Sequence, residues 1–172
     1  MQKIILVGYM GSGKTTIGKN LSLLTGLPFV DLDTYIEEKE NLSIQEIFKT
    51  KGEIYFRKQE HNWLNELLNL NAPIIISLGG GTPCYANNHL LLQNNNVLSF
   101  YLKANITTLV NRLKDAKNRP LLNNIDDLPS FIAQHLFERS YFYNFSQYKI
   151  DVNNKKINNI CNEILEIINL KN

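Results

Sequence analysis

Residues 8–16 read G-Y-M-G-S-G-K-T-T and follow directly on a short apolar run. The stretch satisfies the pattern G-x-x-x-x-G-K-[ST] with Gly8, Gly13, Lys14 and Thr15. Glycines let backbone N–H groups converge on phosphate oxygens, and the start of the following helix adds partial positive charge. Lys14 would reach the β- and γ-phosphates, and Thr15 would offer its hydroxyl to Mg²⁺. The stretch therefore predicts a nucleotide-binding loop between a strand and a helix.

Short apolar runs alternate along the chain with longer segments of helical periodicity. The runs are rich in β-branched residues and have the length of strands. They occupy residues 3–7, 28–32, 74–78, 97–102 and 148–152. The helical segments occupy residues 14–24, 34–51 in two pieces, 52–70, 86–93, 106–114, 128–142 and 155–170. This order is typical of βαβ units, so we predict an α/β fold with a parallel sheet covered by helices on both faces.

Composition excludes several classes of partner. The 172 residues carry 18 Lys+Arg and 16 Asp+Glu, a net charge of +2, which argues against nucleic acid or an anionic membrane surface as the main partner. Cys84 and Cys161 form no disulfide or metal pattern, and no apolar stretch is long enough to span a membrane. We expect one domain over residues 1–172 that works in the cytoplasm, with no nucleic acid and no membrane among its partners.

Arginine is scarce in this chain. The sequence has 24 Asn and 14 Lys but only 4 Arg, namely Arg57, Arg112, Arg119 and Arg139. Lysine cannot reproduce the planar fork with which arginine holds a carboxylate or phosphate in a bidentate way. These four positions are therefore candidates for binding anions.

A phosphate-binding loop does not by itself define the reaction. A GTPase would carry Asn-Lys-x-Asp, but the chain's only Asn-Lys pair, Asn154-Lys155, has Ile157 where the Asp should be. Nucleoside monophosphate kinases typically use several arginines to hold two phosphate-rich ligands, and four in the whole chain are few. A smaller and less charged phosphoryl acceptor fits better.

The second apolar run ends in F-V-D-L-D, with Asp31 and Asp33 two residues apart. Residues i and i+2 of a strand face the same side, so we expect both carboxylates to point into one cleft beside the phosphates. Asp31 would help to hold the metal, and Asp33 would orient the acceptor hydroxyl and accept its proton. The alternative is that Asp33 only caps a helix that begins at Thr34.

The segment F-R-K-Q-E at residues 56–60 places Arg57 and Glu60 at i and i+3 of a helix. Glu60 could then fix the guanidinium of Arg57 while the outer edge of that group binds an anion. A plain surface ion pair is the competing interpretation.

Residues 73–83 read P-I-I-I-S-L-G-G-G-T-P, which places three glycines after the third apolar run. A turn needs only one or two residues with positive φ, and each extra glycine adds unfolded-state entropy. We expect Gly79, Gly80 and Gly81 to leave the backbone open to a ligand, with Gly80 as the position at which a β-carbon would obstruct it.

Together, these motifs, R-P-L-L at residues 119–122 and the pair Arg139 and Tyr143 resemble shikimate kinase, in this order and over essentially the whole chain. The resemblance implies a three-layer α/β/α P-loop fold with a five-stranded parallel sheet in the order 2-3-1-4-5. It implies a monomer that transfers the γ-phosphoryl group of MgATP to the 3-hydroxyl of shikimate, in aromatic amino-acid biosynthesis. It also implies a shikimate-binding segment at about residues 33–61 and a lid at about residues 112–126.

The resemblance implies roles for individual residues. The catalytic groups would be Asp33, Lys14 and Arg119. The ATP-binding residues would be Gly11, Ser12, Gly13, Lys14, Thr15, Thr16, Arg112, Arg119 and Lys156. The shikimate-binding residues would be Asp33, Arg57, Gly79, Gly80, Gly81 and Arg139. Thr15 and Asp31 would serve the Mg²⁺ ion.

Two positions depart from the family's pattern. The family usually has a small hydroxyl residue directly before the glycine triplet, whereas this chain has Leu78 there and Ser77 one position earlier. After Arg139 the family usually continues with a proline, whereas this chain reads S-Y-F-Y. The first departure affects a contact to Mg²⁺ or its bound waters, and the second affects the course of the last part of this helix.

Two other functions stay open from the sequence. A kinase for another small hydroxy acid, such as gluconate, would use the same carboxylate clamp. A nucleotide-binding module without catalysis could share the fold, although it would need no acceptor clamp. The three histidines, His61, His89 and His135, are interpreted as surface or packing residues. Cys84 is interpreted as an incidental neighbour of the acceptor pocket, although a thiol reagent that modified Cys84 could inactivate the protein.

Overall fold

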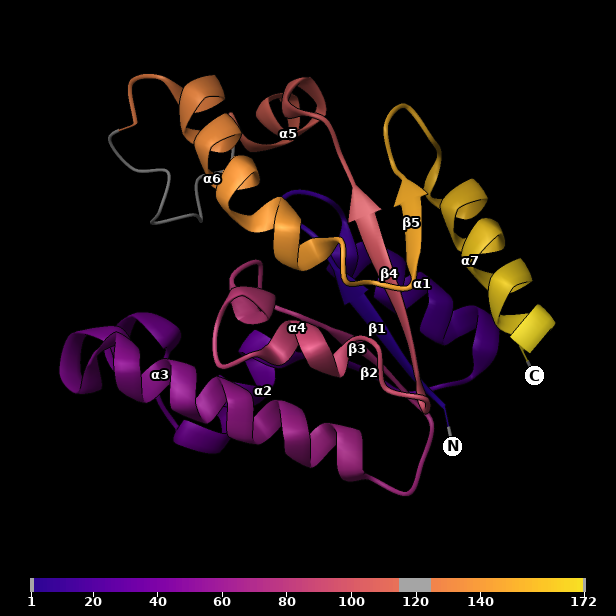
Figure 1. The fold of residues 1–172 in the computed structure, drawn as a ribbon, viewed down its shortest axis with the longest axis horizontal. Coiled ribbons are helices and arrows are strands. Elements are labelled where there is room, and N and C mark those ends of the chain that lie inside the picture. The colour runs from indigo at the N-terminus through magenta and orange to yellow at the C-terminus, as the bar shows by residue number, and fades with distance from the viewer. Residues whose placement is uncertain (1, 115–124, 172) are drawn as a thin grey trace.

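Five parallel strands form one sheet at the centre of the molecule (Figure 1). The computed structural model describes residues 2–114 and 125–171. The strands are β1 (Lys3–Val7), β2 (Phe29–Asp31), β3 (Ile74–Ser77), β4 (Val97–Lys103) and β5 (Tyr148–Asp151). Their order is β2-β3-β1-β4-β5, and every pair of neighbours is parallel. The predicted fold class, strand order and approximate strand positions are confirmed.

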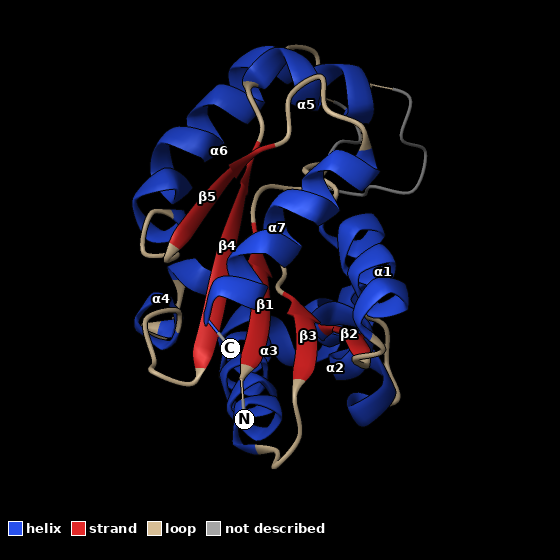
Figure 2. Ribbon diagram, turned by 90° about the vertical axis from the view of Figure 1, so that its right-hand side faces the viewer, coloured by secondary structure: helices blue, strands red, loops and turns tan. Residues whose placement is uncertain are grey.

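Helices cover both faces of the sheet. They are α1 (Lys14–Thr25), α2 (Leu32–Glu40), α3 (Ile44–Asn69), α4 (Asn88–Leu91), α5 (Ile106–Leu113), α6 (Leu128–Tyr143) and α7 (Ile157–Lys171), with a 3₁₀ turn, η1, at Thr82–Cys84. Figures 1 and 2 show α1 and α7 together on one face, and α3, α4 and α6 on the other. The sheet is therefore the middle of three layers.

The core lies where the central strands are covered on both sides. All residues of β1 and β3 are buried, as are all but the last residue of β4. This explains why their sequences are nearly continuous apolar runs rather than alternating ones. Each fully buried Ile or Leu side chain stabilises the fold by about 1.5–3 kcal/mol relative to an exposed one.

Three helix boundaries differ from the predicted ones. Helix α2 begins at Leu32, so β2 is shorter than expected and Asp33 lies in the first helical turn. The predicted break at Gly52 is a kink inside α3, where φ is 82° and ψ is 169°. The helix expected from residue 86 begins at Asn88, because Ala86 and Asn87 have φ values of 49° and 57°.

Local capping explains where several helices begin. Ser43 and Glu46 form a capping box at the start of α3, with the Ser43 hydroxyl accepting from the Glu46 amide. At α5 the side chain of Asn105 accepts from the Thr108 amide at 2.7 Å, which satisfies one of the helix's free N–H groups.

The sheet order decides where a ligand can bind. Strand β3 lies between β2 and β1, so the carboxyl ends of these three strands meet at one edge of the sheet. Open α/β sheets bind ligands outside the carboxyl ends of their strands. Among the residues that the structure describes, no helix has the length and apolar character needed to span a membrane.

Candidate active site

A cavity of about 890 Å³ opens at the carboxyl ends of β1, β2 and β3. Residues 10–16 after β1 form its floor, and it extends past Asp31 and Asp33 to the backbone of Gly79 and Gly80. Arg112 of α5 also lines it. Its size suits a nucleotide or drug-sized ligand.

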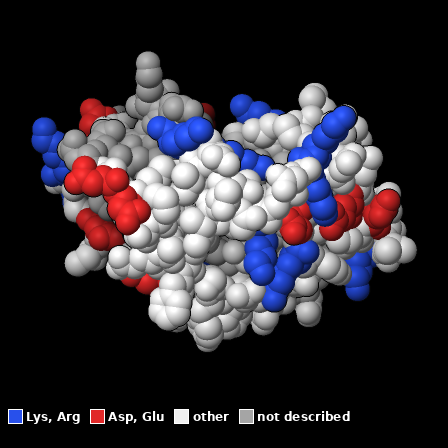
Figure 3. Space-filling view, turned by 90° about the horizontal axis from the view of Figure 1, so that it is seen from above, with Lys and Arg blue, Asp and Glu red and all other residues white. Residues whose placement is uncertain are grey.

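Figure 3 views the molecule from above and so shows the side toward which the strand arrows of Figure 1 point. On this face the Lys and Arg side chains that are drawn in blue stand in separate groups, several of them next to Asp and Glu. This face therefore carries small groups of positive charge rather than one large basic patch, as expected for a chain with a net charge of +2.

The loop after β1 has the backbone of a phosphate cradle. Gly11 and Gly13 have φ values of 80° and 101°, which only glycine adopts readily, and Gly13 is the N-cap position of α1. Lys14 folds back over the loop, and its ammonium group donates to the carbonyl oxygens of Gly8 at 2.8 Å and Tyr9 at 3.1 Å. The positive end of α1 and Lys14 therefore act on the same part of the cavity.

Thr15 and Asp31 are brought together beside this loop. The Thr15 hydroxyl donates to Asp31 Oδ2 at 2.9 Å, and both residues line the cavity. A hydroxyl and a carboxylate are the oxygen ligands that Mg²⁺ prefers, and Mg²⁺ is usually held by one or two protein groups together with substrate phosphates. The two residues fit such an ion.

Asp33 reaches the same cavity by a route that the sequence argument missed. The expected strand geometry is wrong, because β2 ends at Asp31 and Asp33 lies in the first turn of α2. The change from strand to helix still leaves both carboxylates on the cavity wall. The helix also begins before Thr34, so Asp33 is not its N-cap residue.

The carboxyl group of Asp33 is partly shielded from solvent, and its pKa is higher than that of an exposed carboxyl group. Burial is the largest cause that raises the pKa of Asp33 to about 6. The negative charges of Asp31 and Glu60 raise it as well. Lys14 and Arg57 oppose this rise. A carboxylate with such a pKa is a better proton acceptor at neutral pH than an exposed one.

The glycine triplet forms a turn, in which the Thr82 amide donates to the Gly79 carbonyl oxygen at 3.1 Å, and it also leaves room for neighbouring side chains. None of its three residues has a positive φ. A β-carbon at Gly79 would lie 2.7 Å from Asp33 Oδ1, and one at Gly81 would lie 3.1 Å from Arg57 Nη2. At Gly80 the nearest atoms would be 3.6 Å away, an ordinary contact distance. Gly79 and Gly81 are thus the positions at which neighbouring side chains leave little room for a β-carbon, whereas the expectation that a β-carbon at Gly80 would obstruct a ligand stays a prediction.

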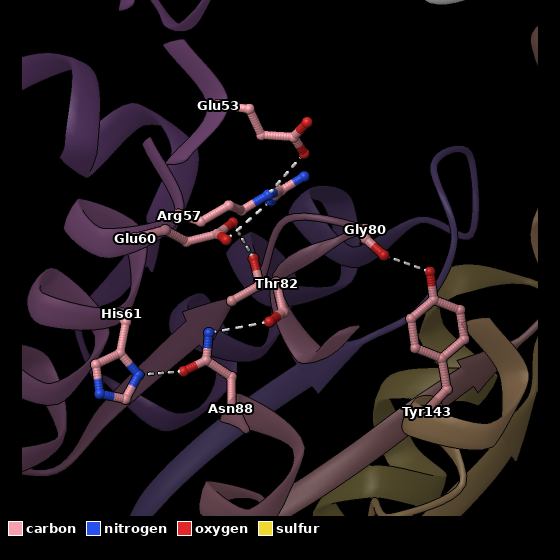
Figure 4. A network of polar contacts seen from close by, with 8 residues as sticks. All are labelled: Glu53, Arg57, Glu60, His61, Gly80, Thr82, Asn88 and Tyr143. Carbon is pink, nitrogen blue, oxygen red and sulfur yellow. Dashed lines mark hydrogen bonds and ion pairs between the residues drawn. The ribbon is translucent and has the colours of Figure 1, made fainter. Parts of the chain in front are cut away.

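Arg57 is held from several directions (Figure 4). Its Nη1 donates to Glu60 Oε2 at 2.9 Å, and its Nε donates to Glu53 at 3.4 Å. The ring of Tyr85 lies against the guanidinium, with its centroid 3.9 Å from Cζ. Because Glu60 is only 1% exposed, the pair is not a plain surface ion pair.

Arg139 comes to the triplet from α6. A β-carbon at Gly80 would lie 3.6 Å from its Nη1, and its guanidinium lies over the ring of Tyr9 at 5.7 Å. One turn further along α6, the Tyr143 hydroxyl donates to the carbonyl oxygen of Gly80. The helix continues to Tyr143 without the proline that is usual in the family.

Tyr9 and His135 are a pair that the sequence analysis missed. The Tyr9 hydroxyl and His135 Nδ1 are 3.0 Å apart, which links the phosphate loop to α6. No local spacing in the sequence marks this pair, because its two residues are 126 positions apart.

Arg112 braces the phosphate loop. Its Nη1 donates to the carbonyl oxygens of Gly11 at 3.0 Å and Ser12 at 3.3 Å, and its Nη2 donates to that of Val152 at 3.2 Å. The guanidinium thus joins this loop to the segment after β5, at the edge of the cavity.

The other expected ATP contacts are less close to the cavity. Lys156 is exposed and is not among the residues that line it, whereas the neighbouring Lys155 lines it and pairs with Glu163 at 2.7 Å. Arg119 lies outside the described residues, as do residues 115–124 of the predicted lid.

Ser77 and Leu78 both line the cavity. Ser77 is the last residue of β3 and stands in register with Asp31 of β2. Ser77 therefore carries a hydroxyl one position earlier than is usual in the family, on the residue paired with Asp31 in the sheet.

Comparison with known proteins decides the family. The sequence profile described as Shikimate kinase matches residues 10–169. A shikimate kinase from Flavobacterium johnsoniae is 56% identical over 171 residues, which cover 98% of this chain and 99% of that protein. The chain belongs to the shikimate kinase family. It is thus an ATP-using kinase of the shikimate pathway.

Solved structures of shikimate kinases agree with this assignment. The enzyme from Bacteroides thetaiotaomicron superposes with a TM-score of 0.89 at 35% identity, over 98% of each chain. The enzyme from Acinetobacter baumannii, solved in complex with shikimate, superposes with a TM-score of 0.88 at 33% identity, over 99% of this chain and 94% of that one. A gluconokinase from Sinorhizobium meliloti has a TM-score of 0.65 at only 16% identity, which shows the shared fold alone.

Alanine at the two crowded glycines should harm different steps. Because none of these backbones has a positive φ, Ala fits the conformation and acts only through its β-carbon. Gly79→Ala should displace both Asp33 and the Thr82 hydroxyl, which would lie 2.9 Å from the new β-carbon, and should lower kcat by about 10- to 100-fold, the typical cost of misplacing a reacting group by about 1 Å. Gly81→Ala should displace Arg57 and raise KM for shikimate instead. Steady-state kinetics would measure both.

KM for ATP and the midpoint of thermal unfolding serve as controls for both variants. An identical change in kcat and KM for the two variants would show that the β-carbons disturb the whole segment rather than separate side chains.

Cys84 should be a slow target for thiol reagents, contrary to the reactivity considered from the sequence. Burial, opposed by Arg139 and Arg57, raises the pKa of its thiol to about 11. The thiolate is the reactive form, so at pH 7.5 alkylation should be on the order of 100-fold slower than that of a free thiol. Mass spectrometry of iodoacetamide-treated protein would give the rate, which should still be rising above pH 9. Labelling at the rate of glutathione at pH 7.5 would contradict the expectation.

Proposed function

We propose that this kinase transfers the γ-phosphoryl group of ATP to the 3-hydroxyl group of shikimate. The observation that carries the proposal is the meeting of three side chains at the glycine triplet. Asp33 lies against Gly79, Arg57 against Gly81 and Arg139 near Gly80. A carboxylate beside a phosphate loop, with two guanidinium groups next to it, suits an acceptor that has both a hydroxyl and a carboxylate.

In the proposed reaction Asp33 acts on the acceptor hydroxyl. Its carboxylate orients the hydroxyl and takes the proton as the new bond between oxygen and the γ-phosphorus forms and the bond to the β-phosphate oxygen breaks. ADP leaves with that bridging oxygen. Lys14 lies where its ammonium would balance the negative charge of the phosphates.

The remaining groups bind and position. Arg57 and Arg139 would hold the carboxylate of shikimate, and the open backbone of the triplet would let the ring approach. Thr15 and Asp31 would hold Mg²⁺, which neutralises phosphate charge when it is bound. Arg112 would keep the phosphate loop in place, and Arg119 is proposed to reach the phosphates from the lid.

The proposal extends to the organisation of the protein. We propose that residues 1–172 form a single domain that works as a monomer, as the resemblance to the family implies. The shikimate-binding segment would be about residues 33–61 and the lid about residues 112–126. The two free cysteines, Cys84 and Cys161, are compatible with the cytoplasm.

A coupled assay of ADP release tests the substrate. Shikimate, gluconate, AMP and CMP would each be offered with MgATP at the same concentration. Shikimate should support turnover, and the other three should stay near the rate without acceptor. ADP release with gluconate but not with shikimate would overturn the proposal. Tight ATP binding without turnover of any acceptor would favour the non-catalytic module.

Replacement of Asp33 by Asn tests the role of the carboxylate. The change keeps the volume and removes the proton acceptor, so kcat should fall by about 100- to 10,000-fold, the range typical of general base catalysis. KM for ATP should change little. Glu166→Gln, at an exposed position of α7, is the matched control for loss of a carboxylate. An unchanged kcat in Asp33→Asn would remove Asp33 from its role.

A further inference from the structure

A closed ring of hydrogen bonds joins α3 to the segment after the glycine triplet (Figure 4). It leaves α3 at Glu60, passes through Thr82 and Asn88, and returns to α3 at His61. None of these links was predicted from the sequence, where His61 was interpreted as a surface or packing residue. The ring begins at the carboxylate that holds Arg57.

Three of the four residues of the ring lie inside the protein, and the fourth, His61, is half-buried. Glu60 is 1% exposed, and Thr82 and Asn88 are 0% exposed. The Thr82 hydroxyl donates to Glu60 Oε1 at 2.6 Å, and Asn88 Nδ2 donates to the Thr82 carbonyl oxygen at 3.0 Å. Buried polar groups that are fully bonded fix one arrangement, because an unmade bond in such surroundings is costly.

The directions of the bonds around His61 follow from its neighbours. Asn65 Nδ2 lies 3.1 Å from His61 Nε2, so this nitrogen accepts and the proton of the neutral ring is on Nδ1. Nδ1 then donates to Asn88 Oδ1, which is 2.6 Å away. This bond orients the amide of Asn88 so that its NH₂ group faces Thr82.

Both oxygens of Glu60 are therefore engaged. Oε2 accepts from Arg57 Nη1 at 2.9 Å, and Oε1 accepts from the Thr82 hydroxyl at 2.6 Å. A carboxylate held at both oxygens has one orientation. The guanidinium that it holds has one orientation as well, since the fork geometry of Arg is planar and rigid.

The same segment also reaches Arg57 from a second side. Ala86 and Asn87 have φ values of 49° and 57°, an unfavourable conformation that persists only where the surroundings enforce it. This two-residue turn lies between Tyr85 and Asn88. The Tyr85 ring centroid lies 3.9 Å from Arg57 Cζ, and the Asn88 side chain donates to the Thr82 carbonyl oxygen. One strained turn thus serves both contacts.

We propose that Thr82 is a positioning residue for the acceptor: supported by Asn88 and His61, it fixes Glu60 so that the guanidinium of Arg57 points at the carboxylate of shikimate. The proposal deepens the proposed function and rests on it. Thr82 donates to Glu60, and neither Thr82 nor Arg57 is among the residues that line the cavity beside the phosphate loop. Its effect should therefore be felt by the acceptor and not by ATP.

Thr82→Val is the direct test, because it keeps the shape and removes the hydroxyl. Loss of one hydrogen bond to a buried carboxylate should raise KM for shikimate about five- to tenfold while KM for ATP stays within about twofold. Thr82→Ser restores the hydroxyl and should return KM for shikimate to within about twofold of the parent value. Asn62→Ala, on the exposed side of α3, is the control for a change in this helix.

A double-mutant cycle shows whether Thr82 acts through Arg57. Lys at position 57 keeps the charge but cannot be oriented as a fork, so Thr82→Val should change KM for shikimate by less than about twofold in the Arg57→Lys background. His61→Phe removes the far support of the ring without touching Glu60. It should raise KM for shikimate in the same direction, by about two- to fivefold, as the loss of one neutral hydrogen bond implies.

The outcomes separate this proposal from the proposed function. If the parent enzyme does not phosphorylate shikimate, the proposed function fails. If the parent is active but Thr82→Val raises both KM values equally, or changes neither, the positioning role is wrong. Equal effects of Thr82→Val with and without Arg57 would also overturn it. Should Thr82→Val fold poorly by circular dichroism, His61→Phe gives the same comparison of the two KM values, and an equal change in both, or in neither, would overturn the positioning role.

Discussion

Asp33 and Arg57 lie so close to the end of β3 that residues 79 and 81 cannot carry β-carbons without displacing them. The two side chains come from α2 and α3, whereas the phosphate loop comes from β1. Only a bare backbone between these elements lets a carboxylate, a guanidinium and a phosphate cradle share one site. The parallel order that places β3 between β2 and β1 supplies that backbone at the right edge of the sheet.

Electrostatics around Asp33 depend on this arrangement. Burial is the largest cause that raises the pKa of Asp33 to about 6, and the negative charges of Asp31 and Glu60 add to it, whereas Lys14 and Arg57 oppose the rise. Lys14 and Arg57 are held by the loop carbonyls and by Glu60 before any ligand arrives. Charges that are fixed in advance need little reorganisation during phosphoryl transfer, which is mainly a matter of positioning and charge neutralisation.

The fold was largely predictable from the sequence, because its strands are short apolar runs and its phosphate loop is a local motif. The pairing of Arg57 with Glu60 was predictable for the same reason, since both lie on one helical turn. Asp33 was assigned to a strand because the sequence pattern does not mark where β2 ends. Thr82 and Asn88 could not be found, because their partners lie 22 and 27 residues away and only the folded chain brings them together.

A crystal structure of this protein with shikimate and ADP would test the account most directly. The shikimate carboxylate should lie within hydrogen-bond distance of Arg57 and Arg139. Its 3-hydroxyl should lie beside Asp33, and its ring should lie against the backbone of residues 79–81. Shikimate bound with its carboxylate on Lys14, or away from the glycine triplet, would contradict it.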